Sequence, residues 1–183
     1  QGAERLEEDA RGEPEAVGFE TFCFAGFVLS ETNKLRVASG IANIYARDAI
    51  TAMAGHNTLN TMYGDRFILG LGVSHVPIVE GFRGHTYGKP VTTMRAYLDA
   101  MEAAELSINA PDRNIVLAAL GPNMLALSRD RTKGAHPYLV TPEHTARARD
   151  ILGPDAWLCV EQKICLTTDA AKAREIAANV LSL

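Results

Sequence analysis

The sequence lacks the features that mark membrane-spanning, secreted and nucleic-acid-binding proteins. No apolar run approaches the roughly 18 residues that a membrane-spanning helix needs. The formal net charge is -4, and Lys and Arg form no basic cluster, which argues against a nucleic-acid partner. The first residues, QGAERLEEDARGEPE, are polar and acidic, unlike a signal peptide. These absences favour a globular protein that has neither a membrane nor a nucleic acid as its partner.

Cysteine is scarce, and the spacings that mark metal or hydrolase sites are absent. Cys23, Cys159 and Cys165 show neither a CxxC spacing nor an even count. We interpret them as reduced thiols of a cytoplasmic protein. No two histidines have the HxxxH or HExxH spacing, so no metal site is predicted. A GxSxG elbow, a P-loop and a pair of carboxylates are missing as well.

What is present is the composition of an ordinary globular domain. Of the 183 residues, 47% are hydrophobic and 22% are charged, which suits one domain with one core over residues 1–183. The chain begins at Gln1 and ends while a helical pattern is still running. We therefore expect it to be part of a longer polypeptide.

Short apolar segments alternate with helical patterns along the chain. A charged helix is predicted at residues 2–10, and an apolar helix that suits burial on all sides at 20–32. Strands are predicted at residues 35–40, 67–73, 114–120, 135–140 and 157–166, with a glycine-rich loop at 74–89. The helices that follow these strands begin after Asp48, near Pro90, near Asn123, after Thr141 and after Thr168.

This alternation predicts an α/β fold with a parallel sheet of right-handed βαβ units. The sheet is either open and doubly wound or part of a (β/α)8 TIM barrel, of which about five of eight strands would be present. In both architectures ligands bind at the carboxyl ends of the strands. The candidate site segments are therefore Ser39–Asn43, Gly72–His75, Leu120–Met124, His136–Tyr138 and Glu161–Lys163.

Two glycine-containing segments follow predicted strands. Gly70-Leu71-Gly72 could begin a dinucleotide-binding fingerprint, but His75 stands where GxGxxG needs its third glycine. We interpret Gly70 as admitting a neighbouring backbone and Gly72 as making a turn. Residues 121–124 (GPNM) lie between a strand and a helix, where free N–H groups could bind a phosphate or where the glycine could simply form the turn.

The histidines divide by position. His75, His85 and His136 fall at or beyond strand ends, so they are candidates for acid–base or ligand contacts. His56 lies inside a predicted helix and is interpreted as structural. His144, in the first turn of another helix, is interpreted as solvated.

Two charged side chains alternate with Gln162 in the last predicted strand. Glu161 and Lys163 would share one face of that strand. Buried charges need partners, so the pair is either a structural ion pair or part of a site.

Several longer segments resemble a known family. VASGIANIYARDAITAMA, DRFILGLGVSH and GHTYGKPVTTMRAYLDAM are followed by LAALGPNMLALSRD, KGAHPYLVTPEHTARARDILGP and the EQK strand. In this order they resemble the bacterial luciferase-like monooxygenase superfamily, and within it the actinobacterial branch of deazaflavin (coenzyme F420)-dependent oxidoreductases. The resemblance covers residues 15–183. It implies a TIM barrel that binds F420 or FMN at its C-terminal face.

The resemblance also implies roles for individual residues. The predicted strands correspond to family strands three to seven, strands one and eight have no counterpart, and polar ARGEP stands in place of strand two. A non-proline cis peptide is implied at Gly40-Ile41, behind the deazaflavin ring. The implied catalytic residues are His75, His136 and Glu161. The implied cofactor-binding residues are Ser39, Gly40, Ile41, Ala42, Gly72, Val73, Ser74, His75, Gly121, Pro122, Asn123, Met124 and Tyr138.

The implied function is that of an F420-dependent oxidoreductase, which moves a hydride between the deazaflavin and a small organic substrate. His75 or His136 would be the proton donor or polar anchor, with Glu161 and Lys163 as a supporting pair. Two alternatives stay open: an FMN-dependent monooxygenase, and a shortened non-catalytic module that binds a flavin or forms dimers. Missing strands would leave sheet edges open, so a partner subunit in a homodimer is expected.

Overall fold

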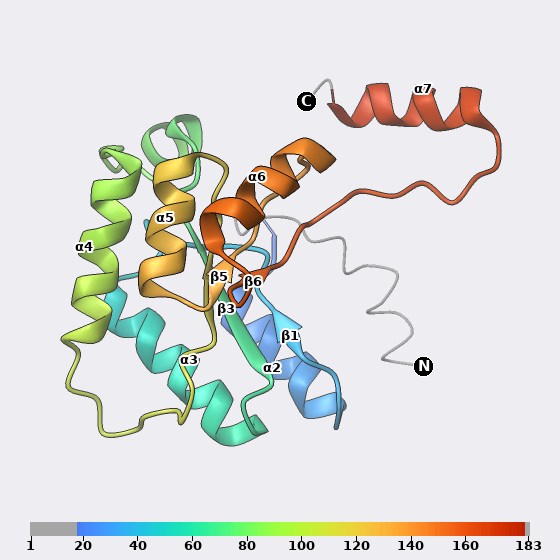
Figure 1. The fold of residues 1–183 in the computed structure, drawn as a ribbon. Coiled ribbons are helices and arrows are strands. Elements are labelled where there is room, and N and C mark those ends of the chain that lie inside the picture. The colour runs from blue at the N-terminus through green and yellow to red at the C-terminus, as the bar shows by residue number, and fades with distance from the viewer. Residues whose placement is uncertain (1–17, 182–183) are drawn as a thin grey trace.

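A computed structural model describes residues 18–181 of the chain (Figure 1). The charged helix predicted at residues 2–10 lies outside the described residues. Within them, no helix is both long enough and apolar enough to cross a membrane.

The strands form one parallel sheet that curves into a half-barrel. Its order is β1-β3-β4-β5-β6, and β2 also pairs with β3. Because β1 and β2 are successive pieces of one chain path, the sheet has five strand positions, as an incomplete TIM barrel would. The bounds are β1 (Val37–Ala38), β2 (Ala42–Asn43), β3 (Phe67–Gly72), β4 (Ile115–Leu117), β5 (Gly134–Ala135) and β6 (Trp157–Leu158).

The helices surround the outside of this sheet, and consecutive ones pack side by side (Figure 1). Figure 1 shows the last helix, α7, set apart from the sheet at the end of an extended segment. The bounds are α2 (Thr21–Glu31), α3 (Ala49–Tyr63), α4 (Pro90–Glu102), α5 (Pro122–Arg131), α6 (Pro142–Leu152) and α7 (Ala170–Leu181).

Local capping signals explain where several helices begin and end. The Asp48 carboxylate accepts a hydrogen bond from Thr51 N at 2.8 Å, and Gly64 ends the same helix with a left-handed φ of 65°. Thr141 caps α6 in the same way. The helix starts predicted after Asp48 and Thr141 are confirmed. The predicted cap of α7 is wrong by one residue, because Asp169 accepts the free N–H groups at 2.9 and 3.1 Å.

The core lies between the sheet and the helices. Phe67, Leu69 and Leu71 alternate along β3 and point outward under the helices, where each is fully buried. The α2 helix covers the sheet with one side only, because Phe27 on its other side is 52% exposed. The expectation that this helix is buried on all sides is therefore wrong.

A buried polar network joins α3 to β3. Asn60 Oδ1 accepts the Phe67 N–H at 2.9 Å, so its Nδ2 is the group that donates to His56 Nε2 at 3.1 Å. The other ring nitrogen, Nδ1, then donates to Asn57 Oδ1 at 3.2 Å. Burial lowers the pKa of His56, so the ring stays neutral. The structural role predicted for His56 is confirmed.

Several predicted elements are shorter or different in the structure. The loop at 74–89 contains a π-helix, η1 (Pro77–Phe82). Beyond β5, the strand predicted to reach residue 140 continues only as a single bridge between Tyr138 and Glu161. The strand predicted to reach residue 166 pairs only over β6 and that bridge. Since β6 is the edge of the described sheet, residues 162–169 have no further strand to pair with there, and they are exposed.

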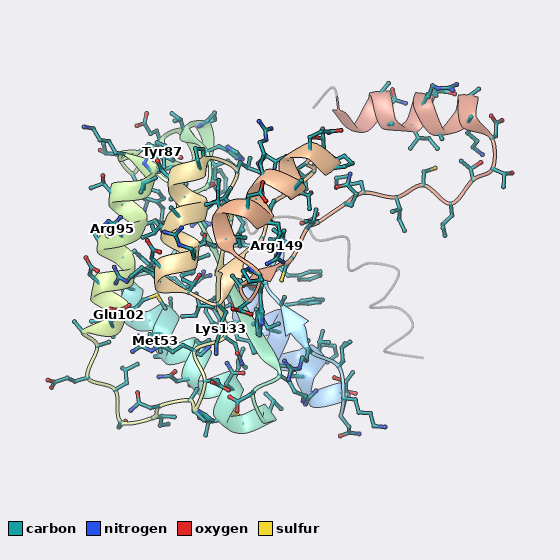
Figure 2. All side chains as sticks on the ribbon, in the orientation of Figure 1. Met53, Tyr87, Arg95, Glu102, Lys133 and Arg149 are labelled. Carbon is teal, nitrogen blue, oxygen red and sulfur yellow. The ribbon has the colours of Figure 1, made fainter. Side chains whose placement is uncertain are left out.

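Hydrogen bonds from the Arg149 side chain to backbone carbonyl groups connect α6 to the chain that follows it. Arg149 of α6 donates to the carbonyl oxygens of Gly153 and Ala156 at 2.7 and 2.8 Å, which anchors this helix to the chain that leads into β6 (Figure 2).

Candidate functional site

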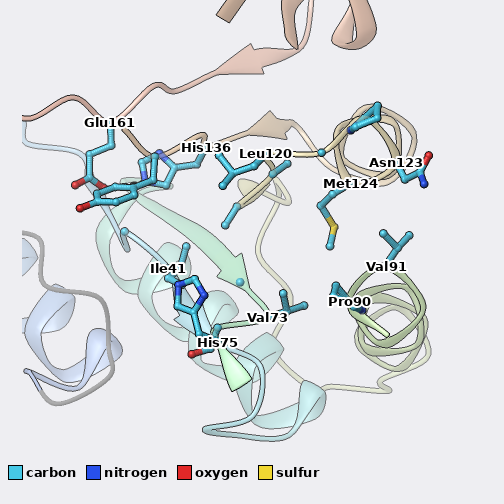
Figure 3. A pocket seen from close by; sticks show the side chains of 18 of the residues that line it. Ile41, Val73, His75, Pro90, Val91, Leu120, Asn123, Met124, His136 and Glu161 are labelled. Atoms are coloured by element: carbon cyan, nitrogen blue, oxygen red, sulfur yellow. Dashed lines mark ion pairs between the residues drawn. The ribbon is translucent and has the colours of Figure 1, made fainter. Parts of the chain in front are cut away.

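A cavity of about 730 Å³ opens at the carboxyl ends of the strands (Figure 3). Its volume lies in the range of about 300–1,000 Å³ that is usual for small-molecule and cofactor sites. The structure brings together at this cavity most of the residues that the sequence singled out. They are Gly40, Ile41, Gly72, Val73, Ser74, His75, Gly121, Pro122, Asn123, Met124, His136, Tyr138 and Glu161.

Ser39 and Ala42, which were expected to bind the cofactor, do not line the cavity. Ala38 pairs with Ile68, and Ala42 pairs with Leu71. The two alanines are four positions apart in the sequence, whereas their partners in β3 are three positions apart. The interrupted strand thus contains one extra residue, a β-bulge. The bulge leaves Ser39 bonded to the Gly70 backbone, donating to its carbonyl at 3.1 Å and accepting from its N–H at 2.8 Å.

The bulge also replaces the backbone feature that was expected beside it. All described peptide bonds are trans, so the predicted cis bond at Gly40-Ile41 is wrong. The chain here carries the extra residue of the bulge, with Gly40 and Ile41 at the cavity and Ala42 buried in the core.

The bulge accounts for both glycines of FILGLG. A Cβ at Gly70 would lie 2.5 Å from the Ser39 carbonyl oxygen, and one at Gly72 would lie 2.7 Å from Ile41 Cδ1. Gly70 therefore admits a neighbouring backbone, as predicted. The interpretation of Gly72 as a turn is wrong, because it is the last residue of β3 and makes room for the Ile41 side chain.

Two residues with strained backbone flank the cavity. Ser74 has a φ of 56° and Leu139 one of 49°, in the left-handed region that residues with a Cβ rarely adopt. Such conformations persist only where neighbours hold them, and they concentrate at functional sites. Leu139 is held by its N–H, which donates to the Glu161 carbonyl at 3.0 Å.

His136 and Glu161 form a pair on one side of the cavity (Figure 3). His136 Nδ1 lies 2.6 Å from the Cys159 carbonyl oxygen, which can only accept, so Nδ1 carries a hydrogen. The other nitrogen, Nε2, lies 3.5 Å from Glu161 Oε2. The two side chains are 17% and 30% exposed, so both remain reachable from the cavity.

The expected pair of Glu161 with Lys163 does not form. Lys163 Nζ lies 5.6 Å from the centre of the Tyr138 ring, a cation–π contact, and Glu161 faces His136 instead. The strand pairing ends at Glu161, so the strict alternation on which that expectation rested does not continue to Lys163.

The other candidate histidines have different places. His75 lies on the cavity rim, away from His136 and Glu161 (Figure 3). His85 lies outside the lining and packs beside Tyr45, with ring centres 6.4 Å apart. His144 is not solvated as predicted, because its Nε2 donates to the Leu120 carbonyl at 2.7 Å.

The start of α5 forms another side of the cavity. Gly121 is its N-cap in an extended conformation, no side chain caps the helix, and Pro122 follows. A Cβ at Gly121 or Gly40 would meet no atom within 4 Å, so both glycines leave open space beside the cavity. Helix N-termini attract anions through their free N–H groups. The described lining contains no Lys or Arg to compete for that role.

The sequence missed several lining residues because nothing local marks them. Tyr87, Pro90 and Val91 come from the long loop and the start of α4, and Ala118 and Ala119 from the chain just after β4. Ala118 and Ala119 could have been found, since they lie near the end of the predicted apolar strand at 114–120. Tyr87 could not, because the fold brings it to the cavity from thirteen residues beyond Ser74. Over the described residues, no group of three or more His, Cys, Asp or Glu is placed to hold a metal ion.

Comparison with known proteins shows the family of the chain. The family model described as luciferase-like monooxygenase matches residues 6–153, well over half of the chain. The protein belongs to the luciferase-like monooxygenase family.

Two curated relatives of this family member carry the names of reductases or oxidoreductases, and one of the names includes coenzyme F420. A Mycobacterium tuberculosis protein, whose name assigns it to the coenzyme F420-dependent oxidoreductases, is 27% identical over 156 residues, covering 79% of this chain and 44% of its own. The 5,10-methylenetetrahydromethanopterin reductase of Methanolobus tindarius is 26% identical over 183 residues, covering 82% and 55%. The chain spans about half the length of these curated relatives.

A solved structure of the same fold is similar as well. The coenzyme F420-dependent tetrahydromethanopterin reductase from Methanopyrus kandleri superposes with a TM-score of 0.71 at 15% identity, over 90% of this chain and 60% of that one. At that identity the likeness shows the fold alone.

Proposed function

We propose that this family member is an F420-dependent oxidoreductase that transfers a hydride between the deazaflavin and a small organic substrate. The observation that carries this proposal is the cavity at the carboxyl ends of the strands, where the His136–Glu161 pair, two bare glycines and a helix N-terminus meet. The name of the Mycobacterium tuberculosis relative, which includes coenzyme F420, supports the choice of cofactor.

The lining fits a flat, partly anionic cofactor. Ile41, Val73 and Met124 offer apolar surface of the kind that a ring system packs against. Gly40 and Gly121 leave room where any side chain would intrude. At the start of α5, Pro122 has no N–H and the Met124 N–H donates to the Gly121 carbonyl at 3.1 Å, so the Asn123 N–H is the group that would face a phosphate. When bound, F420 would supply the site that accepts or donates the hydride.

The proposed role of His136 is to take and return a proton on the substrate. Its Nδ1–H is held by the Cys159 carbonyl, which orients the ring and leaves Nε2 as the nitrogen that exchanges protons. The Glu161 carboxylate beside Nε2 would stabilise the protonated ring. His75, elsewhere on the rim, would be a polar anchor for substrate or cofactor.

Titration of the purified protein with F420, followed by the change in cofactor fluorescence, tests the proposal. We expect saturable binding in the micromolar range, and slower turnover without loss of binding when His136 is replaced by alanine. Absence of binding to both F420 and FMN would contradict the proposed function.

A second candidate is an FMN-dependent monooxygenase, because the family that the chain belongs to is described by that activity. The same cavity would hold the FMN phosphate at the start of α5. Tighter binding of FMN than of F420, together with consumption of oxygen by the reduced complex, would favour this alternative.

A further inference from the structure

The chain between Ser74 and Tyr87 forms a closed loop beside the cavity. It leaves the end of β3, passes through η1 and returns, so that the Tyr87 hydroxyl donates a hydrogen bond to the Ser74 carbonyl oxygen at 3.2 Å. Both residues line the cavity. One hydroxyl group therefore joins two residues that are thirteen positions apart in the sequence, at the point where the loop meets the cavity.

Ser74 is the residue of this loop whose backbone conformation requires a restraint. Its φ of 56° is left-handed, although nothing about serine favours that region as glycine would. A strained residue of this kind relaxes unless its neighbours oppose the relaxation. The contact to its carbonyl oxygen from Tyr87 is the cross-loop bond on Ser74 that the structure records.

Tyr87 is well placed to supply that restraint, because its ring is fixed independently of its hydroxyl. The Tyr87 N–H donates to Glu80 Oε1 of η1 at 3.0 Å. Its ring stacks on Tyr45, with centres 5.8 Å apart and planes 23° apart. The Tyr45 hydroxyl in turn accepts the Gly88 N–H at 2.9 Å.

The hydroxyl also keeps its proton across the physiological range. Burial raises the pKa of Tyr87, and the neighbouring Tyr45 raises it further. The group therefore remains a hydrogen-bond donor to the Ser74 carbonyl at neutral pH.

We propose that Tyr87 is a positioning residue of the cofactor site: its hydroxyl holds Ser74 in the left-handed conformation and thereby fixes the cavity wall at the end of β3. This inference rests on the proposed function. Ser74 lines the cavity, and Tyr87 acts through Ser74.

Tyr87→Phe removes the hydroxyl and leaves the ring stack and the Glu80 contact in place. We expect the Kd for F420 to rise about 2- to 10-fold, the ratio that corresponds to one neutral hydrogen bond. Tyr97→Phe is the matched control. The Tyr97 hydroxyl also donates to backbone carbonyls, those of Arg47 and Asp48, but it does not line the cavity. That variant should lower the melting temperature and leave the Kd unchanged.

A double-mutant cycle with Ser74→Gly separates positioning from direct contact. Glycine adopts a positive φ without restraint, so the Tyr87 hydroxyl should become dispensable in this background. Tyr87→Phe should then change the Kd less than twofold. If the hydroxyl touched the cofactor itself, its removal would cost the same in both backgrounds. That result, or an unchanged Kd for Tyr87→Phe alone, would overturn the proposal.

The rate of amide hydrogen exchange over residues 74–88 of the ligand-free protein measures the coupling between Tyr87 and Ser74 without any cofactor. Tyr87→Phe should speed exchange in this segment, and Ser74→Gly should abolish the difference. If F420 and FMN both fail to bind while this coupling is present, the proposed function is wrong and the positioning of Ser74 by Tyr87 stands. If the coupling is absent, the positioning role is wrong whatever the protein binds.

Discussion

Replacing Gly121 with leucine should weaken cofactor binding and leave the fold intact. Gly121 lines the cavity, and a Cβ at this position would meet no atom within 4 Å. Its φ of -88° and ψ of 155° lie in the extended region that leucine adopts freely. The new side chain would therefore enter the open space beside the start of α5, where we place the cofactor phosphate.

The expected effects on stability and on binding differ in size. Leucine is a poorer N-cap than glycine by up to about 1 kcal/mol, but it also removes about 0.4–1 kcal/mol of conformational freedom from the unfolded chain. The free energy of unfolding should thus stay within about 1 kcal/mol of wild type. Overpacking of a filled site costs about 1–3 kcal/mol, which raises a Kd about 5- to 150-fold.

Fluorescence titration with F420 and urea denaturation measure the two effects on the same protein. Gly81→Leu is the matched control, because a Cβ at Gly81 also meets open space and this glycine does not line the cavity. It should bind F420 as wild type does. If Gly121→Leu keeps the wild-type Kd, no part of the cofactor approaches the start of α5, and the reasoning from open space at Gly121 fails.

Four further predictions concern the core and the His136–Glu161 pair. Gly70→Ala should lower the free energy of unfolding by about 1–3 kcal/mol, because its Cβ would lie 2.5 Å from the Ser39 carbonyl oxygen; a wild-type urea midpoint would refute the bulge geometry. Burial lowers the pKa of His56 in the folded protein, so His56 is protonated more readily in the unfolded chain than in the folded one. The free energy of unfolding should therefore fall as pH drops below about 6.5. In His56→Gln this fall should be shallower, and an identical pH dependence would argue against a neutral buried ring. His136→Ala should lower kcat about 100- to 10,000-fold with little change in the F420 Kd. Glu161→Gln should lower kcat less than His136→Ala does, because the His136 ring keeps its hydrogen bond to the Cys159 carbonyl. Equal losses of kcat in the two variants would indicate a direct role for Glu161.

Local signals in the sequence predicted most of the elements and the end of the sheet that carries the cavity. Asp48 and Thr141 mark helix starts, because each satisfies free N–H groups within its own first turn. The apolar run of β3 indicated a strand buried on both faces. Since parallel strands place their carboxyl ends together, strand order alone predicted which loops would meet.

Contacts between distant residues decided the rest. The sequence contained the glycines at positions 70 and 72, but the bulge that requires them lies about thirty residues earlier in the chain. The partner of Glu161 depended on where β5 and β6 stop pairing, which turned the carboxylate toward His136 and away from Lys163.

By itself, the sequence determined the α/β alternation, the helix caps and the set of strand ends from which a site could be built. These depend on neighbours within a few residues, where propensity, capping and periodicity act. Only the tertiary structure decided the bulge at Gly40, the protonated nitrogen of His136 and the link from Tyr87 to Ser74. Each of these depends on close packing or a hydrogen bond between segments that are far apart along the chain, and no local pattern encodes such a contact.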